Sequence, residues 1–300
     1  MRVFVTGATG LVGSRLCAEL AAAGDVPVGL SRRARNEPGV EWVQGEVSSP
    51  GPWQQAVDGC DAVVHLAGES IASGRWTPRR KQELSDSRIL STRQIVAAMR
   101  EAQSPPRVLV NGSAVGFYGP RGSEELDESS APGKDFLAGL CVAWEREAQE
   151  AVPLGTRVVC LRLGVVLSGD GGALSKMALP FRLGAGGSLG PSGRWFPWVH
   201  EADVTSLIRF ALREPLAGSV NVVAPQRVTM GDFAKTLGRV MHRPALLPVP
   251  LFALRILMGE LADSLSPGQK VRSRAAAQAG FQFQFPELEA ALRACLSEDA

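Results

Sequence analysis

The 300-residue sequence lacks the features of secreted, membrane-spanning and metal-binding proteins. Its five cysteines are an odd number without a C-x-x-C pair, which predicts buried reduced thiols in place of disulfides or a zinc site. The most apolar stretch, residues 246–258, contains two prolines and an arginine and is shorter than the ~20 residues of a spanning helix, so we expect a core helix there. Strand-like sequence starts at Arg2 and leaves no room for a signal peptide. We therefore expect a cytoplasmic protein with no membrane partner and no metal.

The sequence also lacks an excess of charge of either sign. It has 32 basic and 30 acidic residues, a formal net charge of +2, and no basic block longer than an Arg-Arg pair. This balance gives no electrostatic reason to expect binding to nucleic acid or to an anionic membrane. The hydrophobic share of 45% is enough for a sizeable core, and the expected partner is a small-molecule substrate.

The first half of the chain alternates short apolar runs with longer amphipathic stretches. Because the apolar runs are continuous and not alternating, they predict strands of a parallel sheet that is covered by helices on both faces. The expected fold class is therefore α/β, a doubly wound parallel Rossmann sheet. The expected strands are 3–5, 26–30, 62–66, 108–110 and 157–161, and the expected helices are 11–23, 78–100 (capped by Thr77, with Pro78 first) and 135–151.

The pattern changes after about Gly164. Glycine-rich segments at 169–172 and 184–193 interrupt short elements, and Phe281, Phe283 and Phe285 alternate with glutamine as in a half-buried strand. We expect residues 1–164 to form the Rossmann domain and residues 165–300 a smaller substrate lobe on the carboxyl ends of the strands, with possible return of segments to the Rossmann core.

A glycine-rich turn follows the first expected strand and opens the first expected helix. Gly7 permits a tight turn, Gly10 lets backbone approach a pyrophosphate, and Gly13 allows close packing of helix on strand. The helix N-terminus then offers free N–H groups and the positive end of its dipole to the phosphates. The predicted dinucleotide contacts here are Gly7, Thr9, Gly10, Leu11, Val12 and Gly13.

The second expected strand ends in Ser31-Arg32-Arg33. An acidic residue at this place would accept a hydrogen bond from the ribose 2′-hydroxyl of NAD, whereas a hydroxyl and two arginines suit the 2′-phosphate of NADP. The sequence therefore predicts NADP as cofactor, with Arg35 as a competing guanidinium. Leu66-Ala67-Gly68 follows the strand at 62–66 and predicts a small-residue turn that lies against the cofactor.

Thr6 to Gly13 resembles the T-G-x-x-G-x-x-G motif of short-chain dehydrogenase/reductases, and Leu66-Ala67-Gly68 resembles their second nucleotide-side motif. The chain is more closely similar to an atypical, extended subfamily that is called epimerase-family, sugar-nucleotide-epimerase-like or cell-division-inhibitor-like. The residues that carry this resemblance are Leu66-Ala67-Gly68-Glu69, Gly74-Arg75-Trp76, Ser87-Arg88, Asp135-Phe136-Leu137, Trp144-Glu145, Gly164-Val165-Val166-Leu167 and Leu179-Pro180-Phe181. The segments Phe117-Tyr118-Gly119 and Trp198 to Asp203 resemble the extended, nucleotide-sugar-epimerase branch. The resemblance implies an NADP-binding Rossmann domain, and a homodimer through two helices is common in the wider superfamily.

The resemblance also extends the predicted cofactor site. By position it implies cofactor contacts from the helix 78–100, from the end of the strand that leads to Asn111, and from the strand and loop after Thr156. The implied residues are Glu83, Arg88, Ser113, Arg162, Val165 and Val166.

The Y-x-x-x-K pair of working short-chain dehydrogenases is absent. Their tyrosine gives or takes the substrate proton, and the lysine lowers its pKa. The single tyrosine, Tyr118, has no lysine four residues on, and the expected helix carries Leu137 to Cys141 or Leu140 to Trp144 where the pair belongs. The serine that orients the substrate falls on Ala114, with Ser113 one residue before. The catalytic residues are therefore unknown.

Several other side chains are candidates for chemistry, each with an ordinary alternative. Tyr118, Lys134 and Cys141 are possible substitute acids, or else a packed aromatic, a solvated amine and a core thiol. Glu69 and His200 could line the cleft, although His200 also suits a structural hydrogen bond at a helix start. The aromatic residues that could stack on a substrate, or simply form core, are Trp195, Phe196 and Trp198.

Two functions follow from these observations. The first is an NADP-dependent oxidoreductase or epimerase that acts on a small polar or sugar-like substrate through an unorthodox acid or base. The second is a non-catalytic NADP(H)-binding protein for redox sensing or interaction. The retained substrate lobe favours the first function, and the missing dyad favours the second.

Overall fold

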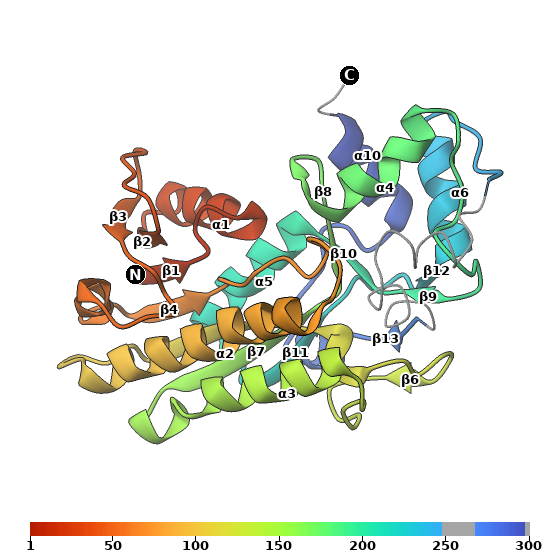
Figure 1. The fold of residues 1–300 in the computed structure, drawn as a ribbon. Helices are drawn as coiled ribbons and strands as arrows, with labels where there is room; N and C mark the ends of the chain where they lie inside the picture. The colour runs from red at the N-terminus through yellow and green to blue at the C-terminus, as the bar shows by residue number, and fades with distance from the viewer. Residues whose placement is uncertain (248–267, 298–300) are drawn as a thin grey trace.

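The structure, a computed structural model, describes residues 1–247 and 268–297. Its centre is a seven-stranded parallel sheet with the strand order β11-β7-β5-β4-β1-β2-β3 (Figure 1). The strands are β1 (Arg2–Thr6), β2 (Val26–Ser31), β3 (Glu41–Gln44), β4 (Ala62–His65), β5 (Val108–Ala114), β7 (Arg157–Leu163) and β11 (Gly218–Val222).

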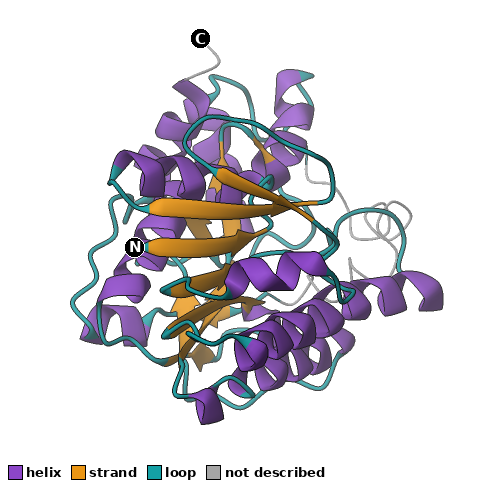
Figure 2. Cartoon of the chain, turned by 90° about the vertical axis from the view of Figure 1, so that its left-hand side faces the viewer, coloured by secondary structure: helices purple, strands orange, loops and turns teal. Residues whose placement is uncertain are grey.

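Helices cover both faces of this sheet (Figure 2). Alternate side chains of each strand point to opposite faces, so Val3 and Val5 join one hydrophobic core and Phe4 joins the other. The first core contains α1 (Leu11–Ala22) and α5 (Glu201–Arg213), and the second contains α2 (Pro78–Glu101) and α3 (Phe136–Gln149). The predicted doubly wound α/β fold is confirmed.

The predicted helices begin where their capping residues stand. The Thr77 hydroxyl accepts a hydrogen bond from the Arg80 N–H at the start of α2, and Pro78 occupies the first helical position. Asp135 caps α3 in the same way through the Ala138 N–H. Each helix and strand predicted in the first half is therefore present in the structure, and its observed ends differ from the predicted ends by up to four residues.

A smaller lobe lies beside the carboxyl ends of the strands, at the right of Figure 1. Its own core is built around Phe181, Trp198, Phe233 and Leu292. Two elements of the second half of the chain belong instead to the central sheet, because β11 pairs with β7 and α5 packs on the sheet. The elements of the lobe are β8 (Val165–Ser168), α4 (Gly172–Arg182), β9 (Trp195–Phe196), β10 (Trp198–His200), β12 (Val228–Thr229), α6 (Met230–Val240) and α10 (Leu288–Leu296).

Short elements connect these parts. The element β6 pairs in parallel with β13, so that a loop of the first half is joined to the segment at residue 270. The connecting elements are η1 (Pro52–Val57), η2 (Val115–Tyr118), β6 (Glu125–Leu126), η3 (Val152–Leu154), β13 (Lys270–Val271) and α9 (Arg274–Gln278).

The predicted strand at Phe281, Phe283 and Phe285 is wrong. Phe281 and Phe283 pack against the core beside α5, as the alternation implies, but the backbone pairs with a side chain and not with another strand. The carboxylate of Asp203 accepts hydrogen bonds from the N–H groups of Gln284 at 2.6 Å and Phe285 at 3.2 Å. A buried carboxylate on α5 thus takes the donors that a strand ladder would have used.

The five cysteines are buried reduced thiols, as predicted. Of the core helix expected at 246–258, all but the first two residues lie outside the described part of the chain. Within residues 1–247 and 268–297 no helix combines the length and apolar character needed to cross a membrane.

Candidate functional site

The strand order reverses between β1 and β4, and the region between the connections that follow these two strands, at the carboxyl edge of the sheet, is called the crevice below. From β1 the chain winds outward through β2 and β3, and from the neighbouring β4 it winds the other way through β5, β7 and β11. Open parallel sheets bind ligands at such a point, because the connections after the two central strands diverge and leave the strand ends accessible. The glycine turn after β1 and residues 66–69 after β4 meet at this crevice.

The glycine turn is shaped by close contacts between backbones. Gly7 has φ +68°, and a Cβ there would lie 2.9 Å from the Ala67 N. A Cβ on Gly13 would lie 2.1 Å from the Gly7 carbonyl oxygen, so only glycine lets α1 pack this closely. Gly10 differs from both, because its backbone is extended and the nearest atom to its Cβ would be 3.2 Å away. Its exposed position leaves the backbone open to a ligand.

The N-terminus of α1 is open at the mouth of this turn. Gly10 is the N-cap, no side chain caps the helix, and no acidic residue lies in the first turn. The first N–H groups of an α-helix have no partner within the helix, and they lie at the positive end of its dipole. Thr9, Leu11 and Val12 surround this end, which is suited to a phosphate group.

A buried histidine fixes the relative position of β1 and β4. The Nδ1 of His65 lies 2.6 Å from the Thr6 hydroxyl, and its Nε2 lies 3.1 Å from the Ser91 hydroxyl of α2. Burial, together with the nearby Arg88, lowers the pKa of His65 to about 3, so the imidazole is neutral. The Thr6 hydroxyl also accepts a hydrogen bond from the Ala67 N–H, which positions the turn at 66–68. Sequence reasoning gave His65 and Ser91 no role, because nothing local distinguishes them from core residues.

Two arginines at the end of β2 are available to a ligand. Arg32 and Arg33 are exposed, and among the described residues neither has an acidic partner within 4.0 Å. Arg35, the competing guanidinium, is engaged with Glu37 at 2.6 Å. The Ser31 hydroxyl is mostly buried and accepts a hydrogen bond from the Arg33 N–H at 3.3 Å.

Arg88 is a largely enclosed cation without a carboxylate partner in the described chain. Its guanidinium donates to the backbone oxygens of Leu84 at 3.2 Å and Glu69 at 2.9 Å, and it lies 5.2 Å from the centre of the Trp144 ring. Burial lowers the pKa of Arg88, because the charged form loses hydration. A guanidinium in this state is suited to an anionic ligand.

Glu83, the other predicted contact on α2, faces two arginines. Its carboxylate pairs with Arg79 at 3.0 Å and Arg80 at 3.1 Å, and Arg80 also reaches the Glu69 carboxylate at 3.2 Å. The predicted cofactor contact of Glu83 stays a prediction, as do those of Val165 and Val166 on β8.

Ser113 and Arg162 lie in a buried polar network. Arg162 forms a two-pronged ion pair with Glu145 of α3, at 2.8 and 2.9 Å, and the Ser113 hydroxyl donates to the same carboxylate at 2.7 Å. The Ser219 hydroxyl of β11 donates to it at 3.0 Å. Their predicted cofactor contacts are not tested by this geometry, but these polar groups have protein partners already.

Tyr118 belongs to the same network and is fully buried. Its hydroxyl donates to Asn221 Oδ1 at 2.7 Å and accepts from Arg162 Nη1 at 3.0 Å. Burial raises the pKa of Tyr118, although Arg162 opposes the shift. A phenol with this burial and these partners is suited to a structural role, and less to proton exchange with a substrate.

Replacing Tyr118 by phenylalanine is therefore expected to lower stability and to leave cofactor binding nearly unchanged. The variant leaves Asn221 Oδ1 without its donor in the interior, which costs about 1–3 kcal/mol. Urea denaturation measures the free energy of unfolding, and fluorescence titration with NADPH measures binding. A stable variant that loses turnover a hundredfold would instead identify Tyr118 as a general acid.

The other candidate acids differ in exposure. Cys141 is buried against η2, and burial raises its pKa to about 11. Lys134 is exposed on the loop before α3, and Glu69 is partly exposed at the crevice. His200 caps α5, because its Nδ1 accepts the Ala202 N–H at 3.1 Å, and burial lowers its pKa to about 4.

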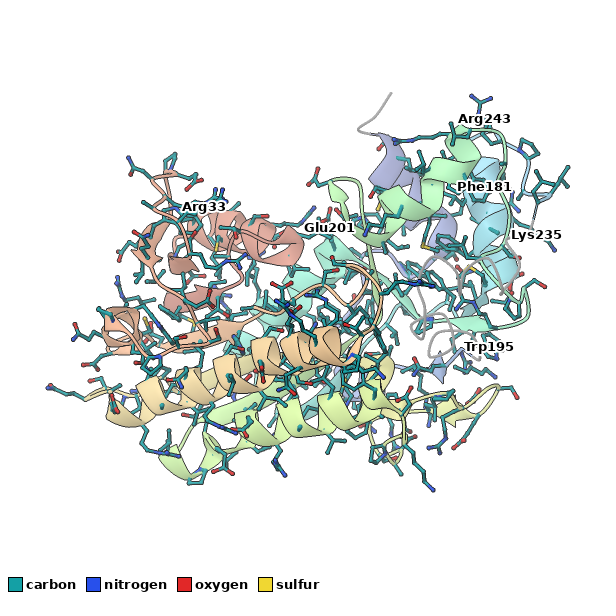
Figure 3. The ribbon with its side chains drawn as sticks, viewed as in Figure 1. Arg33, Phe181, Trp195, Glu201, Lys235 and Arg243 are labelled. Carbon is teal, nitrogen blue, oxygen red and sulfur yellow. The ribbon has the colours of Figure 1, made fainter. Side chains whose placement is uncertain are left out.

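The three aromatic residues of the lobe do not share one role. Phe196 and Trp198 are buried in the lobe core, with Trp198 Nε1 donating to the Gln226 carbonyl oxygen at 3.0 Å. Trp195 is partly exposed, and the ammonium of Lys270 lies 4.9 Å from its ring (Figure 3). Trp195 is thus the member of this group that remains accessible.

The fold and the glycine turn define a Rossmann-type protein of the short-chain dehydrogenase/reductase kind. A family model described as the NAD dependent epimerase/dehydratase family matches residues 3–224, and one described as a domain of unknown function (DUF1731) matches residues 249–295. The chain belongs to the NAD dependent epimerase/dehydratase family and, within it, to the SDR39U1-like epimerase family proteins.

Named relatives match along almost the whole chain. The chloroplastic SDR39U1 homolog of Arabidopsis thaliana is 40% identical over 99% of this chain and 87% of that protein. Human SDR39U1 is 38% identical over 98% of this chain and 99% of that protein. The crystal structure of human SDR39U1 with NADPH has a TM-score of 0.88 at 35% identity and covers 99% of both chains. A Bacillus cereus UDP-glucuronic acid 4-epimerase has a TM-score of 0.80 at 14% identity over the full length of both chains, a likeness of fold alone.

Proposed function

We propose that this protein binds NADP(H) in the crevice between the glycine turn and residues 66–69. The observation that carries the proposal is the uncapped N-terminus of α1, reached over the extended backbone of Gly10. The diphosphate takes the free N–H groups there, and the adenosine half extends towards β2. The NADPH in the human relative of the same family and fold supports this assignment.

Arg32 and Arg33 select NADP over NAD by binding the 2′-phosphate. Both guanidinium groups lie at the end of β2 without an acidic partner in the described chain, and there is no carboxylate at positions 31–33 to accept a ribose hydroxyl. A charge-assisted hydrogen bond to the phosphate contributes about 1.5–3 kcal/mol, which corresponds to roughly tenfold to a hundredfold in affinity.

The double variant Arg32→Ala, Arg33→Ala tests this selectivity. We expect wild-type protein to bind NADPH at least tenfold more tightly than NADH, and the variant to lose most of this preference while its affinity for NADH changes little. Isothermal titration calorimetry measures both dissociation constants. Arg35→Ala is the matched control, because Arg35 already pairs with Glu37. Equal wild-type affinities for the two cofactors, or a loss of preference in the control alone, would contradict the assignment.

The activity that this site supports is oxidation–reduction or epimerisation of a small polar or sugar-like substrate. When bound, NADPH supplies a hydride. The chain's own residues bind and orient the cofactor and exclude water from the site. The substrate enters between the Rossmann domain, residues 1–164 with α5 and β11 returned to it, and the lobe formed by the rest of residues 165–300. UDP-sugars and simple carbonyls are expected to show little turnover because the usual tyrosine–lysine pair is missing. Mass spectrometry of small molecules that copurify with the protein identifies the substrate class.

A non-catalytic role in redox sensing or interaction is the second candidate. It is favoured because candidate catalytic groups already have partners inside the protein: the Tyr118 hydroxyl donates to Asn221, and the Ser113 hydroxyl donates to Glu145. Tight NADPH binding without turnover of any tested carbonyl or sugar would support it. Analytical ultracentrifugation with and without NADPH tests whether a homodimer forms and whether the cofactor controls it.

A further inference from the structure

One glycine just after β4 and one within the neighbouring β5 make room for a stacked cation and ring beside the crevice. A Cβ on Gly68, just after β4, would lie 3.3 Å from the Arg88 guanidinium carbon. A Cβ on Gly112 of β5 would lie 3.2 Å from the Trp144 ring. Arg88 from α2 and Trp144 from α3 thus fill the space between the two strand ends, with the guanidinium 5.2 Å from the ring centre.

The positive charge of Arg88 is not cancelled by a carboxylate. Its guanidinium donates to the backbone oxygens of Leu84 and Glu69 and to the Ser87 hydroxyl. Two carboxylates of the neighbouring elements pair with other arginines, Glu69 with Arg80 and Glu145 with Arg162. An aromatic face attracts a cation without neutralising it. In addition, the Trp144 Nε1 is buried and has no hydrogen-bond partner within residues 1–247 and 268–297. This part of the crevice therefore offers a cation without a carboxylate partner in the described chain and an unused donor.

The topology places this charge beside the nicotinamide half of the cofactor. With the diphosphate at the turn after β1 and the adenosine half over β2, the remaining half extends over β4 and β5. The nicotinamide ring is positively charged in NADP⁺ and neutral in NADPH. A unit charge about 8–12 Å away, in surroundings of effective dielectric about 20, changes the affinity for one more unit charge by roughly tenfold or more.

We propose that the Arg88–Trp144 stack makes this site selective for the reduced cofactor, so that the protein binds NADPH more tightly than NADP⁺. The inference rests on the proposed NADP(H) site and adds its redox preference. Trp144 stands on α3 at one of the two positions where the usual lysine could fall, and Arg88 reaches its ring from α2. A site of this kind follows the ratio of NADPH to NADP⁺, whether or not a substrate is turned over.

The ratio of the two dissociation constants is the direct test, and it needs no substrate. Calorimetric titration of the full chain is expected to show NADPH binding at least tenfold more tightly than NADP⁺. In Arg88→Met, which keeps the length of the side chain and removes its charge, the ratio is expected to fall to within about threefold of one. Arg88→Lys keeps the charge and is expected to retain most of the preference. Arg93→Met, on the same helix but in a surface pair with Glu147, is the matched control and is expected to keep the wild-type ratio.

The outcomes separate this inference from the proposed site. Absence of binding of either redox form by the wild-type protein would overturn the proposed function itself. Equal wild-type affinities would overturn only the redox preference. A parallel loss of both affinities in Arg88→Met, with an unchanged ratio, would show that Arg88 binds a phosphate common to both forms. Thermal unfolding curves identify any variant that fails to fold. If Arg88→Met fails to fold, the ratio of the two dissociation constants in Arg88→Lys is compared with the wild-type ratio instead.

Discussion

Replacing Gly10 by valine is expected to abolish NADPH binding while the protein keeps its fold. The extended backbone of Gly10 accepts an L-side chain, and the nearest atom to its Cβ is the Gly7 carbonyl oxygen at 3.2 Å. The branched side chain would, however, stand over the N–H groups that receive the diphosphate. We expect a loss of at least a hundredfold in affinity and a fall in melting temperature of only a few degrees. Fluorescence titration and differential scanning calorimetry measure the two effects.

Gly13→Ala is the matched comparison within the same turn. Its Cβ would lie 2.1 Å from the Gly7 carbonyl oxygen, so α1 must move away from β1. Overpacking of this kind typically costs 1–3 kcal/mol or more. The expected result is therefore loss of both stability and binding, whereas Gly10→Val loses binding alone. Retained NADPH binding in Gly10→Val would place the phosphates elsewhere.

The second large effect is expected from Glu145→Gln. Glu145 accepts two hydrogen bonds from Arg162 and one from each of two serine hydroxyls, and Arg162 is 4% exposed. Removing the carboxylate charge leaves a buried guanidinium without its counter-ion, which costs about 3–5 kcal/mol. Guanidinium chloride denaturation, followed by circular dichroism, measures the change in the free energy of unfolding.

The control for this prediction stands two residues along the same helix. Glu147 pairs with the exposed Arg93, so Glu147→Gln is expected to cost no more than about 1 kcal/mol. The double variant Glu145→Leu, Arg162→Met removes both charges and is expected to be more stable than Glu145→Gln. A cost in Glu145→Gln as small as that in the control would show that water solvates Arg162 when its partner is removed.

The sequence predicted the parts of the fold that are encoded locally. The glycine turn, the caps at Thr77 and Asp135 and the buried strands each depend on residues within a few positions of one another, so their patterns are readable without the rest of the chain. The strand at 41–44 was missed because it has only two apolar residues, Trp42 and Val43, between two polar ones, a run too short to indicate a strand.

The site was predictable only on its cofactor side. The role of Tyr118 depends on Asn221, 103 residues away, and on Arg162, 44 residues away, and no local sequence pattern predicts those contacts. The segment at Phe281 to Phe285 fails for the same reason, since its strand-like alternation is real but its hydrogen-bond partner is Asp203. The Arg88–Trp144 stack likewise joins two helices whose sequences carry no common motif.

The place of β11 in the sheet has a consequence for how the protein is made. Strand β7 ends at Leu163, but its outer partner β11 begins only at Gly218, about 55 residues later. At a synthesis rate of about 5–20 residues per second, the apolar edge of β7 waits roughly 3–11 seconds for its neighbour. An unpaired strand edge is a template for pairing with other chains. The nascent chain is therefore most exposed to aggregation, and to chaperones, in the interval between the synthesis of these two strands.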